Sequence, residues 1–319
     1  SAYVLLHHYM GEVDGTVGAW GYSRGGMGSI TQAMSKSLQS KGGEVKAGSP
    51  VTKILIKNNR SYGLVLENGD EIYANKIVSN LDVKRTFLKV VEQNQLPEDF
   101  YLAVKNFKIR GSSGKLNIAL DDLPAWKSIP VGDPAGTGDL HITQSIEEME
   151  RAYDDWKDGK WSANPYVDMC VPSINDPTIA PQGKHYMSVF IQYVPYNLAD
   201  GGWTEEKRKE FGSHVMNRIG SYSNNFNDII KHAEIRTPKE LEAEVGLTEG
   251  NIFQGELTMD QLMFNRPIPG YAQYKTPIKN LYMCGSSTHP GGGVMGAPGA
   301  NAAREILRDM NKQIESHYI

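Results

Sequence analysis

The segment from Asn280 to Arg304 constrains the fold of this chain more than any other stretch. It begins with a short apolar run, continues through a loop with six glycines between Gly285 and Gly299, and ends in a helical pattern. Glycine permits positive φ angles and lets another group approach the main chain closely. The following helix adds free N–H groups and the positive end of its dipole. This strand–loop–helix unit predicts a surface shaped for a ligand, and a loop that only turns the chain is the simpler alternative.

Composition excludes several classes of protein. The 319 residues suffice for one to three domains, and the formal net charge of −4 without a Lys/Arg-rich run argues against a nucleic-acid partner. Cys170 and Cys284 form no CxxC pair, which argues against a disulfide framework and favours a reducing compartment, so we expect the cytoplasm. No apolar run is long enough for a transmembrane segment. Contact with a membrane surface through an oily substrate entrance stays an alternative.

No metal site is expected. The adjacent residues His7 and His8 point in different directions on a helix or a strand, and no acidic or cysteine partner accompanies them at ligand spacing.

The hydrophobic periodicity predicts an α/β chain in three regions. Residues 19–82 read as a helix with apolar Ile30, Ala33, Met34 and Leu38, followed by strands at 51–56, 62–66, 71–73 and 76–78. Residues 83–275 are more polar, with helices at 145–157 and 205–222 around a strand at 186–194. Residues 276–319 give a strand, the glycine loop and a helix whose buried stripe is predicted as Ala303, Ile306, Leu307 and Met310. We expect the terminal regions to form one layered structure, interrupted by an inserted domain with a mixed or antiparallel sheet.

Four motifs in this order resemble the C-terminal half of the phytoene desaturase and carotenoid isomerase family of FAD-dependent oxidoreductases. They are Gly18–Gly28 (GAWGYSRGGMG), Gly48–Ile54 (GSPVTKI), Ala74–Asn80 (ANKIVSN) and Cys284–Gly299 (CGSSTHPGGGVMGAPG). The subgroup that the chain resembles is the pyridine nucleotide-disulfide oxidoreductase domain-containing protein 2 type. Each motif is weak alone, and the set is specific.

The resemblance implies a fold, a reaction class and a site. Residues 1–82 and 276–319 would form an FAD-binding, Rossmann-like layer, and residues 83–275 a substrate domain. The reaction would be dehydrogenation, desaturation or isomerisation of an apolar, carotenoid-like molecule. Val51 would contact the adenosine end of FAD through its main chain, Gly285 would lie near the ribityl–phosphate chain, and the flavin ring would lie along the glycine loop. The implied cofactor-binding residues of that loop are Gly285, Gly291, Gly292, Gly293, Val294, Met295 and Gly296. His289 is a candidate for protonating a substrate, and bracing of the loop is its alternative role.

The chain departs from the family pattern in one motif, the GxGxxG turn. The family begins with a strand, a GxGxxG turn and a helix that hold the FAD pyrophosphate, and Gly25–Thr31 has the wrong spacing for that turn. We therefore expect a truncated member, incomplete in its dinucleotide-binding layer, in which FAD is absent or weakly bound. A homodimer, or a partner chain that carries the missing segment, is expected to cover the exposed surface. Two alternatives stay open: a cofactor-free interaction or regulatory module that retains the flavoprotein fold, and a different nucleotide-binding enzyme that takes NAD or ATP.

Overall fold

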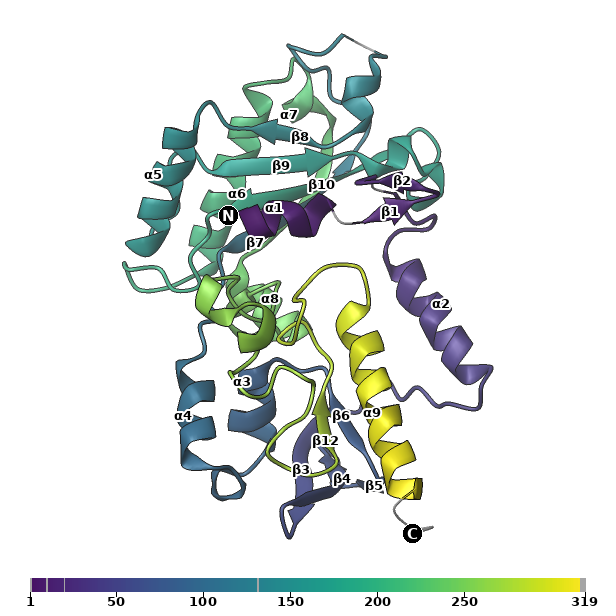
Figure 1. Cartoon of the computed structure of the whole chain (residues 1–319). Helices are drawn as coiled ribbons and strands as arrows, with labels where there is room; N and C mark the ends of the chain where they lie inside the picture. Colours follow the sequence, from purple (N-terminus) through teal and green to yellow (C-terminus); the bar gives the residue numbers. More distant parts are fainter. Residues whose placement is uncertain (1, 10, 20, 131, 316–319) are drawn as a thin grey trace. The chain divides into compact units, whose positions relative to one another are not determined.

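The computed structural model describes residues 2–9, 11–19, 21–130 and 132–315, and it divides into two compact units (Figure 1). Unit 1 contains Ser1–Val45 and Ser112–Leu241, and unit 2 contains Lys46–Gly111 and Glu242–Ile319. Each unit thus combines two stretches of chain that are distant in sequence. These boundaries differ from the functional division at residues 82 and 275, and the assignment of cofactor and substrate to those ranges stays a prediction.

Unit 1 is built around an antiparallel sheet with the strand order β11-β7-β10-β9-β8. The strands are β7 (Ser113–Leu120), β8 (Leu140–Ile142), β9 (Tyr166–Cys170), β10 (His185–Gln192) and β11 (Ile230–Arg236). The helices that follow the sheet strands in sequence are α5 (Ile146–Lys157), α6 (Glu205–Gly220) and α7 (Phe226–Ile229). The first part of the chain contributes α1 (Ala2–Tyr9), β1 (Glu12–Val13), β2 (Thr16–Val17) and α2 (Gly28–Gln39).

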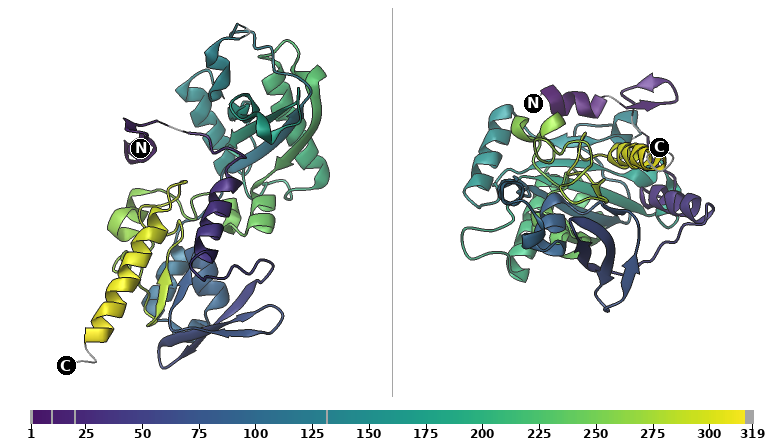
Figure 2. Two further views of the ribbon diagram at one scale, coloured as in Figure 1. Left: turned by 90° about the vertical axis from the view of Figure 1, so that its right-hand side faces the viewer. Right: turned by 60° about the horizontal axis from the view of Figure 1, so that its bottom comes forward.

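The core of unit 1 lies on one face of this sheet. Leu116 and Ile118 of β7 and Val189 of β10 are buried there, and Phe211 and Val215 of α6 cover them. Alternate residues of a strand point to opposite faces, which explains why every second residue of these strands belongs to the core. Figures 1 and 2 show the helices α6 and α7 on this side of the sheet. On the opposite face, the half-buried side chains include Lys115, Asn117, Ser188 and Phe190.

Unit 2 contains a β-meander and a separate pair of parallel strands. The meander is β3 (Val51–Lys57), β4 (Arg60–Leu66) and β5 (Glu71–Tyr73), and the parallel pair is β6 (Ile77–Ser79) with β12 (Leu281–Met283). Its helices are α3 (Val83–Arg85), α4 (Glu98–Asn106) and α9 (Ala297–Glu315), and α8 (Pro238–Val245) leads into it from unit 1.

The core of unit 2 explains why residues outside the predicted layer belong to it. Val83, Phe87 and Val104 from the segment after β6 are buried together with Ile268 and Leu281. Phe87 and Phe100 pack edge to face, with ring centroids 4.9 Å apart. Burial of such side chains stabilises a fold by about 1.5–3 kcal/mol each. Residues 83–111 and 242–275 therefore pack with the parallel strands rather than with the sheet of unit 1.

The α/β class is confirmed, and the structure has helices and strands in the regions where periodicity predicts them, with shifts of a few residues at the ends. These elements are α2, β3, β4, β5, β6, β10, α5, α6 and α9.

The predicted stripe of α9 is wrong in most of its positions. Ala303 is exposed, Leu307 is 58% exposed and Met310 is 43% exposed, whereas Ile306 is half-buried. The inner side of α9 is partly polar: Ala302 is buried there, and Asp309 accepts hydrogen bonds from Lys275 Nζ at 2.8 Å and from the Tyr282 hydroxyl at 2.9 Å. A helix can pack through paired polar groups, and apolar spacing then no longer indicates the buried face.

Candidate functional site

The glycine loop follows β12 at the carboxyl end of the parallel pair. β6 leads into Asn80 and β12 into Cys284, and the Cys284 amide donates to the Ser79 carbonyl at 2.8 Å. The loop then runs from Gly285 to Gly296 and enters α9 at Ala297. In open α/β sheets, ligands bind outside the carboxyl ends of parallel strands. The position of the loop in unit 2 thus agrees with a ligand-binding role.

The first half of the loop is buried, and its glycines are required by the chain itself. A Cβ on Gly285 would lie 2.4 Å from the Asn80 carbonyl oxygen, and one on Gly292 would lie 2.7 Å from the Phe253 ring. Gly291 has a φ of 113°, a conformation that L side chains rarely adopt. The simpler alternative, glycines that serve packing and turning, therefore accounts for these three positions. Their predicted contacts with a cofactor stay predictions.

The second half of the loop is exposed and has a different character. Val294 is 75% exposed and Met295 is 45% exposed, between Gly293 with a φ of 142° and Gly296 with a φ of 66°. Among the described residues, none has an atom within 4 Å of a Cβ built on Gly296 or Gly299.

Among the glycines from Gly285 to Gly299, Gly299 is the one that neither packing nor a positive φ explains, and Gly28 at the start of α2 is equally uncrowded. Gly299 lies in the first turn of α9, and in a helix interior glycine costs up to about 1 kcal/mol relative to alanine. The described chain supplies no neighbour and no positive φ that would require it. The described chain thus leaves the space beside the Gly299 Cα unfilled.

Val51 and His289 lie in unit 2 but apart from this exposed half. Val51 begins β3 in the meander, and its proposed contact with adenosine stays a prediction. His289 is half-buried, and its carbonyl accepts a hydrogen bond from the Tyr274 hydroxyl at 2.9 Å. The same hydroxyl accepts from Asn301 of α9 at 2.9 Å, so the His289 main chain is linked to that helix. A catalytic role for the His289 side chain stays a prediction.

Sequence reasoning missed the residues that form hydrogen bonds with the buried half of the loop. Arg266 is fully buried and donates to the Ser286 carbonyl from Nε at 3.1 Å and from Nη2 at 2.7 Å. The Ser287 hydroxyl donates to the Gln254 carbonyl at 2.6 Å and accepts from the Val83 amide at 3.1 Å. Neither Arg266 nor Gln254 belongs to a recognisable motif, and only the tertiary structure brings them to the loop.

Unit 1 carries a second group of interacting side chains, on the face of its sheet opposite the core. Burial raises the pKa of Cys170 to about 11, with the Asp139 carboxylate adding to the effect, and burial together with Cys170 and Asp139 raises the pKa of Tyr22 to about 12. Burial also lowers the pKa of Lys115, whose ammonium group donates to the Ser188 hydroxyl. These shifts keep the thiol protonated at neutral pH.

Glycine-rich helix starts can bind phosphate, and in this chain the turn before α2 contacts a carboxylate. The Gly25 amide donates to Asp176 Oδ2 at 2.5 Å, and this bond contributes to the lowered pKa of Asp176, after the hydrogen bond from Thr178.

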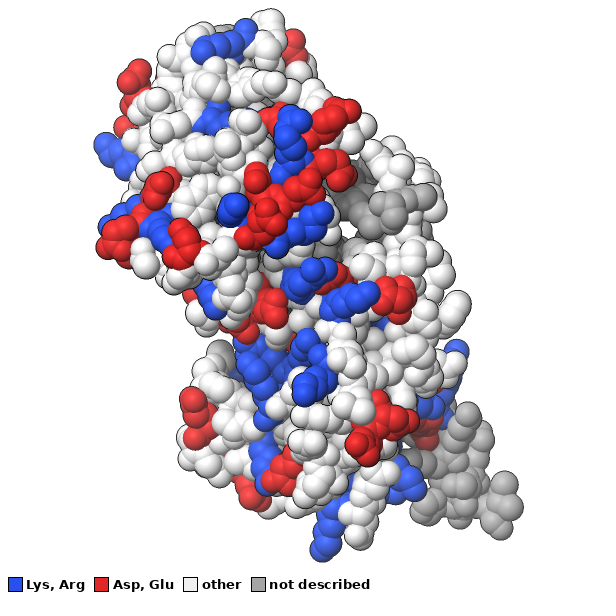
Figure 3. Space-filling view, turned by 90° about the vertical axis from the view of Figure 1, so that its left-hand side faces the viewer, with Lys and Arg blue, Asp and Glu red and all other residues white. Residues whose placement is uncertain are grey.

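Neither a metal cluster nor a membrane-spanning helix is found in the described chain. There, no group of three or more His, Cys, Asp or Glu residues is placed to hold a metal ion. The side chains of His7 and His8 lie outside the described residues. None of the described helices has the length and apolar character needed to cross a bilayer. On the face drawn in Figure 3, Lys and Arg side chains are interspersed with Asp and Glu.

Comparison with known proteins identifies the family. The sequence profile of flavin-containing amine oxidoreductases matches residues 1–219, which is more than half of the chain. The chain belongs to this flavin-containing amine oxidoreductase family. It is 38% identical over 318 residues to pyridine nucleotide-disulfide oxidoreductase domain-containing protein 2 of Mus musculus, covering 97% of this chain and 55% of that protein. It is 27% identical over 331 residues to the chloroplastic prolycopene isomerase of Daucus carota, covering 98% of this chain and 48% of that protein. The resemblance inferred from the four motifs is thereby confirmed.

Solved structures support the same fold for this family member. An oxidoreductase from Methanosarcina mazei superposes with a TM-score of 0.50 at 16% identity, over 89% of this chain and 55% of that chain. Wild-type putrescine oxidase bound to putrescine gives a TM-score of 0.53 at 12% identity, over 89% of this chain and 53% of that chain. The chain spans about half the length of the curated relatives that it matches.

The crowding at Gly285 gives a stability prediction. We expect Gly285→Ala to lower the free energy of unfolding of unit 2 by about 1–3 kcal/mol, because its methyl group would press on the Asn80 main chain. Urea unfolding of the chain measures the change. The matched control is Gly28→Ala at the start of α2, where a Cβ meets no described atom within 4 Å and no loss is expected. Equal stability of the two variants would contradict the account of the buried half.

The burial of Cys170 gives a pH prediction. Because its pKa is raised from 9.0 to about 11, the reactive thiolate is scarce below pH 11, and we expect alkylation at pH 8 to be at least tenfold slower than for a free cysteine. The rate should rise with pH up to about 11. Iodoacetamide labelling of Cys284→Ser, followed by mass spectrometry, isolates the reaction of Cys170. Rapid labelling at pH 8 would show that the thiol is not buried in solution.

Proposed function

We propose that this chain supplies the flavin-contacting loop of an FAD-dependent oxidoreductase. The observation that carries the proposal is the glycine at position 299, in the first turn of α9, where no described neighbour excludes a side chain. A ligand that lies against this main chain accounts for the missing side chain. The exposed Val294 and Met295 add an apolar rim on the same segment.

FAD, when bound, supplies the redox chemistry by accepting two electrons as a hydride equivalent from the substrate. The chain's own contribution is binding and electrostatics. Val294 and Met295 offer apolar surface to a flat ring, and the N–H groups at the start of α9 favour negative charge by about 0.3–1 kcal/mol. Gly285 and Val51 are proposed to contact the ribityl–phosphate and adenosine parts. His289 is proposed only as a candidate for proton transfer.

The proposed substrate is an apolar small molecule that undergoes dehydrogenation, desaturation or isomerisation. Support comes from the names of relatives at 24–27% identity, which are prolycopene isomerase, lycopene-forming phytoene desaturase and one component of limonene dehydrogenase. Prolycopene, phytoene and limonene are hydrocarbons. We propose the cytoplasm as the compartment, on the grounds that Cys170 and Cys284 are both free thiols.

A polypeptide partner is the second part of the proposal. None of the residues of α2, all of which are described, is buried, and Ile30, Met34 and Leu38 are exposed on it at a spacing of four residues. An apolar stripe of this kind is typical of an interaction surface. We propose that a second copy, or a chain that carries a GxGxxG segment, covers it. The same observation favours the alternative function, a cofactor-free interaction module.

Gly299→Ala tests the flavin proposal through two effects of opposite sign. Alanine should stabilise the unliganded helix by up to about 1 kcal/mol, because its helix propensity is higher. It should also weaken FAD binding at least tenfold, because the methyl group occupies the space proposed for the ligand. Thermal unfolding measures the first effect, and a titration followed by flavin fluorescence measures the second.

The control for this experiment is Ala300→Gly, one residue further along the exposed side of α9. It should destabilise the helix by a similar amount and leave FAD affinity within twofold. If Gly299→Ala binds FAD as tightly as the wild type, the loop is not the flavin site. If the wild type binds no FAD but titrates with NAD or ATP, the chain is a different nucleotide-binding protein, and binding of none favours the interaction module.

Met34→Lys tests the partner surface. The substitution places a charge in the exposed stripe of α2, where Met34 is 63% exposed, and it should abolish self-association without lowering the melting temperature. Sedimentation velocity of the purified chain measures the change, and Gln32→Lys, on the opposite side of the same helix, is the control. A wild-type chain that is monomeric at all concentrations excludes the second copy and leaves the GxGxxG chain as the proposed partner.

A further inference from the structure

Arg266 is a buried cation whose hydrogen bonds reach two different segments of unit 2. It donates twice to the Ser286 carbonyl at the start of the glycine loop. Its Nη2 also donates to the Phe253 carbonyl at 2.8 Å and to the Gly255 carbonyl at 3.3 Å. A buried charge is costly unless polar groups surround it, and main-chain carbonyl dipoles provide that compensation here. The guanidinium group therefore holds these carbonyls together.

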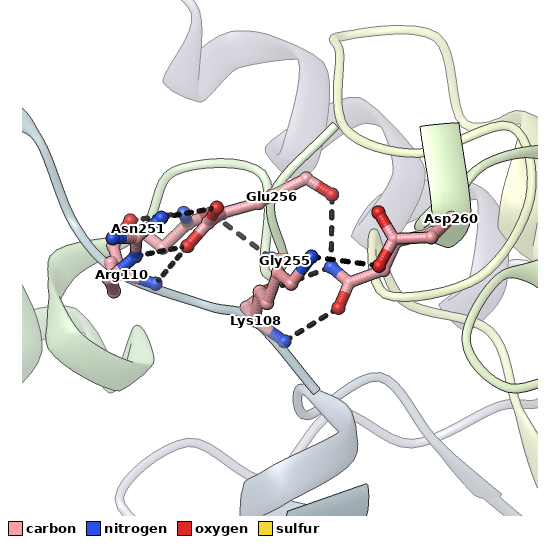
Figure 4. A network of polar contacts seen from close by, with 7 residues as sticks. Lys108, Arg110, Asn251, Gly255, Glu256 and Asp260 are labelled. Carbon is pink, nitrogen blue, oxygen red and sulfur yellow. Dashed lines mark hydrogen bonds and ion pairs between the residues drawn. The ribbon is translucent and has the colours of Figure 1, made fainter. Parts of the chain in front are cut away.

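The segment on one side of Arg266 is anchored independently of the loop (Figure 4). The Glu256 carboxylate accepts from Arg110 Nε at 2.7 Å and Nη2 at 3.0 Å, and Asn251 Nδ2 donates to the Arg110 carbonyl at 2.8 Å. Gln261 pairs with the main chain of Lys108, accepting from its amide at 2.6 Å and donating to its carbonyl at 2.9 Å. Residues 251–261 are thus tied to residues 108–110 by side chains other than Arg266.

The buried half of the glycine loop contacts or approaches the Arg266 guanidinium near its first residue, at Ser286, and near its last, at Gly291. Ser286 accepts two hydrogen bonds from the guanidinium, and a Cβ on Gly291 would lie 3.6 Å from Arg266 Nε. Gly292 is packed against Phe253, a residue whose carbonyl Arg266 also binds. Gly293, Val294 and Met295 follow directly, so their position depends on how firmly this half is held.

We propose that Arg266 is a positioning residue that holds the glycine loop in its ligand-binding shape before the ligand arrives. A loop that is already ordered loses less conformational entropy on binding, so its affinity is higher. Arginine suits this task better than lysine, because its planar guanidinium donates in several fixed directions at once. The identity of the ligand as FAD rests on the function proposed above, whereas the ordering of the loop does not.

Arg266→Lys tests the role while the positive charge is retained. In the chain without FAD, we expect amide hydrogen exchange of residues 285–296 to become at least tenfold faster, with residues 113–120 of unit 1 unchanged. The dissociation constant for FAD should rise at least tenfold. At saturating FAD, the resolved shoulders of the visible flavin absorption band should weaken, which a loss of global stability alone would not cause.

Arg266→Met removes both the positive charge and the N–H donors of the guanidinium. If that variant folds, we expect larger increases in loop exchange and in the FAD dissociation constant than for Arg266→Lys. The matched control is Arg110→Met, which deletes an exposed guanidinium that contacts the same segment through Glu256. The segment then keeps the hydrogen bonds of Asn251 and Gln261 to the main chain of Arg110 and Lys108. The loop exchange and FAD affinity of Arg110→Met should stay within twofold of the wild type.

The outcomes separate this inference from the proposed function. Wild-type loop exchange in Arg266→Lys, or an equal change in Arg110→Met, would overturn the positioning role. If the wild type binds no FAD, the proposed function fails, and the exchange measurement alone decides whether Arg266 orders the loop. Faster exchange in Arg266→Lys with unchanged FAD affinity would show that loop order does not matter for binding, which also overturns the inference.

Discussion

The parallel pairing of β6 with β12 is the constraint on which unit 2 depends. Ile77 lies opposite Leu281 and Ser79 opposite Met283, although about two hundred residues of chain separate the two strands. Closing so long a loop costs conformational entropy, which the shared core of Val83, Phe87, Ile278 and Leu281 offsets. The pairing also places the end of each strand beside the other. Both the loop after β12 and the crowding of Gly285 against Asn80 follow from it.

The glycine loop has two halves with different physical demands. In the buried half, neighbouring groups occupy or border the space that side chains would need. These groups are the main chain of Asn80, the ring of Phe253 and the guanidinium of Arg266. In the exposed half, the described chain imposes no such limit at Gly296 or Gly299. Internal packing therefore accounts for glycine at Gly285 and Gly292, and it does not account for glycine at Gly296 or Gly299. A count of glycines cannot make this distinction.

Much of the local structure was predictable, because it follows from local rules. The strands β3 to β5 are joined by turns at Asn58–Asn59 and Asn68–Gly69. Helix α5 follows its N-cap Ser145, whose side chain accepts from the Glu148 amide at 3.2 Å. The inner face of α9 was not predictable, because Asp309 pairs with Lys275 and Tyr282, which are distant in sequence. The division into units also escaped prediction, since it depends on which core residues 83–111 join.

By itself, the sequence determined the α/β class, the family resemblance and the segment in which a ligand site was to be sought. The class and the segment rest on periodicity, on turn chemistry and on a run of glycines, which act between neighbouring residues, and the resemblance rests on four motifs in a fixed order. Only the tertiary structure decided which glycines are crowded by remote segments and that Arg266 contacts the loop. The reason is that these properties are distances between atoms of remote segments, and such distances exist only once β6 and β12 have paired.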